Sequence, residues 1–273
     1  MATTFPDAQL VDLLDEVWSS MADLGDSLAE SDWKTVTECP GWTVQDNLAH
    51  IVGIESTILG RPEPEMPTPV GDHLKNDVGV RNEVWVEAWR DRAGSDVLRE
   101  FRAVTRERLA ALRAPDADFG AESWTPVGPG TVRDLLPFRV FDSWVHEQDM
   151  RRALGRLPGE DDAVGEMAFD RITAVLPMIV GKRVAPPEGT VVVFDVTGPI
   201  RRTLAIGVEG GRAKVLDAAP DAPAAVLRTD SDTIVRLGTG RGDPGAILAG
   251  GAVELIGDSE LGAGVAKSMN FLF

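Results

Sequence analysis

The sequence has few residues of several types that mark particular classes of protein. A single cysteine, Cys39, leaves no partner for an internal disulfide and fits a reducing compartment. No apolar run reaches the roughly 18 residues of a membrane-spanning helix, and the first residues lack the basic and apolar regions of a secretory signal. Basic residues are outnumbered, since 27 Lys and Arg stand against 44 Asp and Glu and give a formal net charge of −17. We therefore predict a cytoplasmic protein. We expect neither nucleic-acid nor membrane partners, because phosphates and an anionic membrane surface would repel its negative charge.

The length of 273 residues favours two domains, and the pattern of the chain changes near residue 183. Before that point, apolar residues recur at spacings of three and four, which predicts a bundle of four or five helices. After it, β-branched segments and the turn Glu209-Gly210-Gly211 indicate strands and a hairpin, followed by short helices. We therefore predict a helical bundle over 1–182 and a smaller α+β domain over 183–273.

Two residues of the 141–152 segment suggest half of a metal site. Asp142 and His146 are four residues apart, which places them one turn apart on one helix face. Pro137 suits the first turn of this helix and Gly155 suits its end. The alternative is an ordinary polar stripe with one histidine, so a third ligand is needed. The sequence has only three histidines, and His50 lies at the edge of the apolar stripe of the helix that Thr43 would cap.

A set of His50, Asp142 and His146 would bind a divalent metal. Two imidazoles and a carboxylate with an open fourth position favour Zn²⁺, although iron, manganese, nickel or cobalt would also accept these donors. Such a metal would hold a bound thiol as its thiolate. The third histidine, His73, is a weaker candidate near a loop with four prolines at 61–69. Asp149 would either orient the ring of His146 or pair with Arg152.

A glycine-rich turn at 236–244 carries two arginines in the second domain. It lacks the Gly-Lys-Ser/Thr ending of a phosphate loop and a preceding strand. Arg241 in this turn would pair with a substrate carboxylate if the turn faced the metal; otherwise it is a surface arginine at a helix start.

Three segments together resemble the mycothiol-dependent maleylpyruvate isomerase family. They are Cys-Pro-Gly-Trp-Thr-Val-Gln-Asp-Asn-Leu-Ala-His at 39–50, Trp-Val-His-Glu-Gln-Asp at 144–149 and Leu-Gly-Thr-Gly-Arg-Gly-Asp-Pro at 237–244. The resemblance implies a DinB-like metal-binding helix bundle followed by a domain similar to sterol-carrier proteins. It also implies a zinc site whose pattern falls on His50, Asp142 and His146, with aspartate where the family has glutamate. The family's C-terminal arginine most resembles Arg241.

The resemblance implies mycothiol as a low-molecular-weight thiol cosubstrate and a small electrophile as substrate. The thiolate would add to an activated double bond, the bond would rotate, and the thiolate would leave. The same thiolate in an S-transferase would stay on the electrophile. Two other hypotheses remain open, namely a non-catalytic protein that binds an apolar ligand and a metal-dependent hydrolase that needs no thiol.

Overall fold

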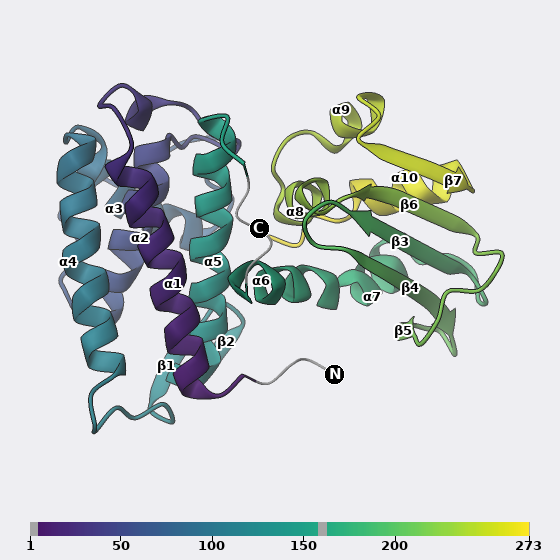
Figure 1. The fold of residues 1–273 in the computed structure, drawn as a ribbon, viewed down its shortest axis with the longest axis horizontal. Helices are drawn as coiled ribbons and strands as arrows, with labels where there is room; N and C mark the ends of the chain where they lie inside the picture. The colour runs from purple at the N-terminus through teal and green to yellow at the C-terminus, as the bar shows by residue number, and fades with distance from the viewer. Residues whose placement is uncertain (1–4, 158–162, 273) are drawn as a thin grey trace. The chain divides into compact units, whose positions relative to one another are not determined.

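The computed structural model describes residues 5–157 and 163–272, which form two compact units that divide near residue 158 (Figure 1). The predicted fold class is confirmed, because a helical bundle precedes a smaller unit built on a sheet. The division lies before residue 163, whereas the sequence placed the domain boundary after Lys182. Residues 163–182 group with the second unit because the helices in this segment contact helices and strands of that unit.

The first unit is a bundle of five long helices. They are α1 (Asp7–Asp26), α2 (Val44–Ile58), α3 (Asp77–Arg90), α4 (Gly94–Leu112) and α5 (Val132–Ala153). Helix α1 packs against α4 and α5, and α2 packs against α3, α4 and α5. A 3₁₀ turn, η1 (Asp32–Lys34), precedes α2, and a hairpin of β1 (Glu122–Thr125) and β2 (Gly128–Thr131) precedes α5. Buried apolar side chains fill the centre, among them Leu14, Met21, Leu48, Phe101, Leu136 and Trp144.

The two helices that carry the candidate ligands, α2 and α5, begin with the same device. Thr43 caps α2 and Thr131 caps α5, and in each case the aspartate three residues later accepts a hydrogen bond from the backbone N–H of the cap residue. The cap at Thr43 was expected. Helix α5 begins at Val132, earlier than the first turn that Pro137 suggested, because the Thr131 cap and β2 determine its start.

The second unit packs helices on a five-stranded sheet. Its elements are α6 (Ala163–Ala174), α7 (Leu176–Met178), the π-helical η2 (Ile179–Val184), β3 (Val191–Thr197), β4 (Arg202–Glu209), β5 (Arg212–Leu216), β6 (Ala225–Asp230), α8 (Ser231–Thr239), α9 (Pro244–Ala249), β7 (Val253–Gly257) and α10 (Ser259–Lys267). The strand order is β5-β4-β3-β6-β7, and only β3 and β6 run parallel. Buried Phe194, Ile206 and Leu227 belong to its core.

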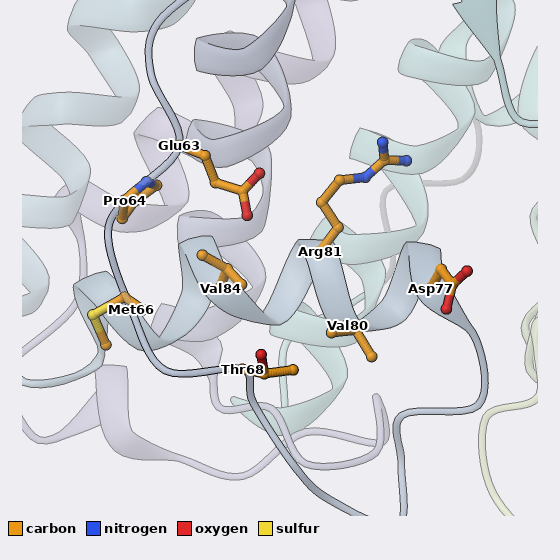
Figure 2. Close-up of a pocket in the computed structure, with 8 residues that line it drawn as sticks. All are labelled: Glu63, Pro64, Met66, Thr68, Asp77, Val80, Arg81 and Val84. Carbon is orange, nitrogen blue, oxygen red and sulfur yellow. The ribbon is translucent and has the colours of Figure 1, made fainter.

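The proline-rich segment at 61–69 forms an irregular loop that lies along α3. Loop and helix together border an open groove of about 280 Å³ (Figure 2). It is lined by Glu63, Pro64, Met66, Thr68, Asp77, Val80, Arg81 and Val84. Across the described ranges, no helix combines the length and apolar character needed to cross a bilayer.

Candidate metal centre

The three residues chosen from the sequence lie together inside the helical bundle. His50 comes from α2, and Asp142 and His146 come from successive turns of α5. The Nε2 atom of His50 lies 3.1 Å from Oδ2 of Asp142, and Nε2 of His146 lies 3.7 Å from Oδ1. The centroids of the two imidazole rings are 4.7 Å apart. One donor atom from each residue therefore falls within 4.8 Å of the other two.

This donor set fits a divalent cation. Two imidazole nitrogens and one carboxylate oxygen are the ligands of many catalytic zinc sites, which leave a further position open. Both histidines are buried, whereas 31% of the Asp142 side chain is exposed. Asp142 is therefore the member of the cluster that solvent contacts most.

The second nitrogen of His146 faces two other side chains. Its Nδ1 atom lies 2.6 Å from Oδ1 of Asn47 and 3.5 Å from Oδ2 of Asp149. Asp149 also accepts a 2.7 Å hydrogen bond from Arg152. Asp149 therefore pairs with Arg152, one of the two roles considered for it. It also lies near the His146 ring, but Asn47 makes the shorter contact with that ring. The sequence signal for Asn47 was its place three residues before His50 on the same helix.

His146 also belongs to a second group of possible ligands. Cys39 and Asp149 approach His146 closely enough for the three to form a ligand cluster, and all three are buried. The backbone N–H of Cys39 donates to the hydroxyl of Thr37, which also donates to the carbonyl of Trp42. Cys39 thus belongs to the turn that precedes α2.

Trp42 forms one wall of the cluster. Its ring centroid lies 5.0 Å from that of His50 and 5.4 Å from that of His146. Its indole N–H donates a 2.7 Å hydrogen bond to the buried carboxylate of Glu83 on α3. Gly41 has a φ of +82°, a conformation that favours glycine, and it turns the chain so that Trp42 reaches the histidines. Of the other tryptophans, Trp144 is buried and Trp124 is 48% exposed.

A buried charge network that the sequence did not reveal supports Asp142. Arg139, one turn earlier on α5, donates to Oδ2 of Asp142 at 2.9 Å and to Glu55 of α2 at 2.7 Å. Arg108 of α4 lies 3.5 Å from the other oxygen of Glu55. These charges alternate in sign, which allows them to be buried together.

The remaining candidates lie outside this cluster. His73 lies 3.4 Å from Glu83, so it is near the far side of Trp42 and not among the three possible ligands. Arg241 belongs to the second unit, where its side chain is buried and its Nη1 atom donates to the carbonyl of Thr239 at 2.7 Å. Its role at a substrate stays a prediction.

The charges in the cluster predict a loss of stability in acid. Burial lowers the pKa of His50 below its ordinary value, against the attraction of Asp142. Burial raises the pKa of Asp142, but its interactions with His50 and Arg139 outweigh this effect and lower the pKa well below its ordinary value. The unfolded chain therefore binds more protons than the folded chain in acid. The free energy of unfolding consequently decreases as the pH decreases.

We expect the metal-free protein to lose stability as the pH falls through about 6.5, where an unfolded histidine takes up its proton. A further loss begins below about 3.9, where the carboxyl of Asp142 in the unfolded chain takes up its proton. Urea unfolding of the wild type and of His50→Gln across this range measures both losses. The loss of stability near pH 6.5 should disappear in His50→Gln. Equal losses in both proteins near pH 6 would contradict the assignment of that loss to His50.

Two family models match the two units in order. The mycothiol maleylpyruvate isomerase N-terminal domain matches residues 14–151, and the MDMPI C-terminal domain matches residues 166–261. Two crystal structures of mycothiol-dependent maleylpyruvate isomerase, one of them a histidine-to-alanine mutant, superpose with TM-scores of 0.56 and 0.53. Each is 17% identical, and each alignment covers 93% of this chain and 95% of the other. No curated protein sequence matches the chain.

Proposed function

The chain belongs to the mycothiol-dependent maleylpyruvate isomerase family of enzymes, and on this premise we propose that it is a divalent-metal enzyme with mycothiol as its cosubstrate. The observation that carries the proposal is the convergence of His50, Asp142 and His146 inside the bundle. Zn²⁺ is our first choice of metal because two imidazoles and one carboxylate match its preferred donors. A reduced thiol cosubstrate and a single cysteine also favour action in the cytoplasm.

When bound at these residues, a divalent cation would act as a Lewis acid and keep a thiol in its deprotonated form. The protein's own residues prepare the site in three ways. Arg139 holds one oxygen of Asp142 and leaves the other toward His146. Trp42 covers the two rings and limits the approach of water. The partial exposure of Asp142 leaves a route for a thiol and a small electrophile.

The substrate that fits this chemistry is a small electrophile with an activated double bond. In an isomerisation, a carbon–sulfur bond forms, the former double bond rotates, and the same carbon–sulfur bond breaks to return the thiol. In an S-transfer, that bond remains, and the thiol proton goes to the neighbouring carbon. We further propose that Arg241 binds an acid group of the substrate, because a guanidinium pairs with a carboxylate through two parallel hydrogen bonds.

The fate of the thiol distinguishes the two reactions. We expect turnover of maleylpyruvate to require Zn²⁺ and mycothiol, with many product molecules formed for each thiol supplied if the enzyme is an isomerase. One thiol consumed for each product would identify an S-transferase instead. Parallel measurement of the free thiol and of the substrate's absorbance gives this ratio, with the metal-free protein as control. Turnover at the full rate without any thiol would contradict the proposal and favour a hydrolase.

A further inference from the structure

The contact between Asn47 and His146 determines which nitrogen of that histidine carries hydrogen. The amide nitrogen of Asn47 donates to the carbonyl of Thr43 at 2.8 Å and to the hydroxyl of Thr37 at 3.2 Å. The hydroxyl of Thr37 gives its own hydrogen to the carbonyl of Trp42, so it accepts from Asn47. Both neighbours of the amide nitrogen are therefore acceptors. The amide oxygen must consequently face Nδ1 of His146, 2.6 Å away.

A carboxamide oxygen only accepts hydrogen bonds, so Nδ1 of His146 must be the donor. Asp149 is a second acceptor on the same side, at 3.5 Å. A neutral imidazole with hydrogen on Nδ1 has its lone pair on Nε2, and this atom faces Asp142 at 3.7 Å. The segment from Thr37 to Asn47 thus orders both the ring and its tautomer.

We propose that Asn47 is a positioning residue that fixes His146 in the Nδ1–H tautomer and so directs Nε2 toward the cluster with His50 and Asp142. This selection decides between the two groups of possible ligands that share His146. A protonated Nδ1 has no lone pair for a cation, so the nitrogen that lies 3.5 Å from Asp149 is closed to metal. The tautomer of His146 follows without a metal, and only the use of Nε2 as a ligand rests on the proposed function.

The two histidines are therefore unequal before any ligand binds. Within the described part of the chain, Nδ1 of His50 is buried without a hydrogen-bond partner, and its Nε2 lies 3.1 Å from Asp142. A neutral His50 meets this carboxylate by donating from Nε2, and it must transfer that hydrogen to Nδ1 before Nε2 can bind a cation. His146 needs no such change, because Asn47 has already placed its hydrogen on Nδ1.

Nitrogen NMR of the metal-free protein at alkaline pH tests the inference directly. The sequence has three histidines, so the imidazole spectrum of ¹⁵N-histidine-labelled protein can be assigned with His50→Ala and His73→Ala. We expect His146 to show a protonated Nδ1 and an unprotonated Nε2. In Asn47→Leu the ¹⁵N chemical shifts of Nδ1 and Nε2 of His146 should move toward the average of the two tautomers. They should remain at the wild-type values in Asn47→Asp, which keeps an acceptor oxygen, and in Asp149→Asn.

Chelator competition with Zn²⁺ gives an independent measurement. Loss of an outer partner of a ligand histidine lowers metal affinity by roughly 10–100-fold, and we expect this loss in Asn47→Leu. An averaged or Nε2-protonated His146 in the wild type would overturn the inference even if Asn47→Leu failed to fold. An unchanged tautomer in a folded Asn47→Leu would overturn it as well. If the wild type showed the expected tautomer but bound no Zn²⁺, the proposed function would fail while the role of Asn47 in setting the tautomer would stand.

Discussion

Replacing His146 by alanine should abolish stoichiometric Zn²⁺ binding and lower the thiol-dependent kcat/KM at least about a thousandfold. Lewis-acid stabilisation by a bound metal contributes several kcal/mol to catalysis, and each 1.36 kcal/mol corresponds to a factor of ten in rate. His146 is a proposed ligand with a neighbour at each ring nitrogen, because Asn47 contacts Nδ1 while Nε2 faces Asp142. Its loss leaves two of the three proposed ligands at the cluster. Steady-state kinetics with varied mycothiol, combined with metal analysis of the purified variant, measure both effects.

The matched control for this variant is His73→Ala. His73 is the same residue type and lies in the same unit, but it contacts Glu83 and is not one of the clustered ligands. We expect His73→Ala to keep its metal and to change kcat/KM by less than about tenfold, a cost of roughly 1.4 kcal/mol. Similar losses of metal in the two variants would mean that alanine substitution disturbs the bundle generally and would contradict the assignment of His146.

Replacing Glu55 by alanine should lower the free energy of unfolding by about 3–5 kcal/mol, the usual effect of removing one member of a buried ion pair. The carboxylate of Glu55 is fully buried between Arg139 and Arg108. Without it, two guanidinium groups remain in the interior, and Asp142 still pairs with that of Arg139. Urea unfolding of the metal-free proteins at neutral pH measures the loss.

Glu100→Ala is the corresponding surface control. Glu100 accepts a hydrogen bond from Arg61 at the same 2.7 Å as Glu55 accepts from Arg139, but both partners of the surface pair are partly exposed. Exposed pairs contribute about 0–1 kcal/mol, so this variant should unfold nearly as the wild type does. Equal losses of unfolding free energy in the two variants would show that burial of the pair does not determine its contribution. Such a result would contradict a special role of the buried network in stability.

Periodicity and turn chemistry in the sequence predicted much of this fold. The helices that carry the candidate ligands, the cap at Thr43 and the strands after residue 190 all follow from local patterns. The start of α5 did not, because a threonine cap and a short hairpin override the usual position of proline in a first turn. The boundary after Lys182 also differed, since the contacts of α6, α7 and η2 are made in the folded state and leave no mark in composition.

The three candidate ligands could be chosen from the sequence, but the residues around them could not. Helical spacing brought Asp142 and His146 onto one face, and the scarcity of histidine drew attention to His50. Glu55 had no such signal and Asn47 had only its place one turn before His50, because the partners they meet on α5 lie far away in the sequence. A buried glutamate and a surface glutamate look alike in sequence, so no local pattern placed Glu55 in the interior. Only the packing of α2 on α5 distinguishes them.

Native mass spectrometry of the purified chain, titrated with Zn²⁺, tests the central claim most directly. The wild type should bind one ion per chain, and His50→Ala, Asp142→Ala and His146→Ala should each reduce that occupancy at equal Zn²⁺, whereas His73→Ala should not. A wild type that binds no stoichiometric metal, or ligand variants that retain full occupancy, would contradict a metal centre at these three residues.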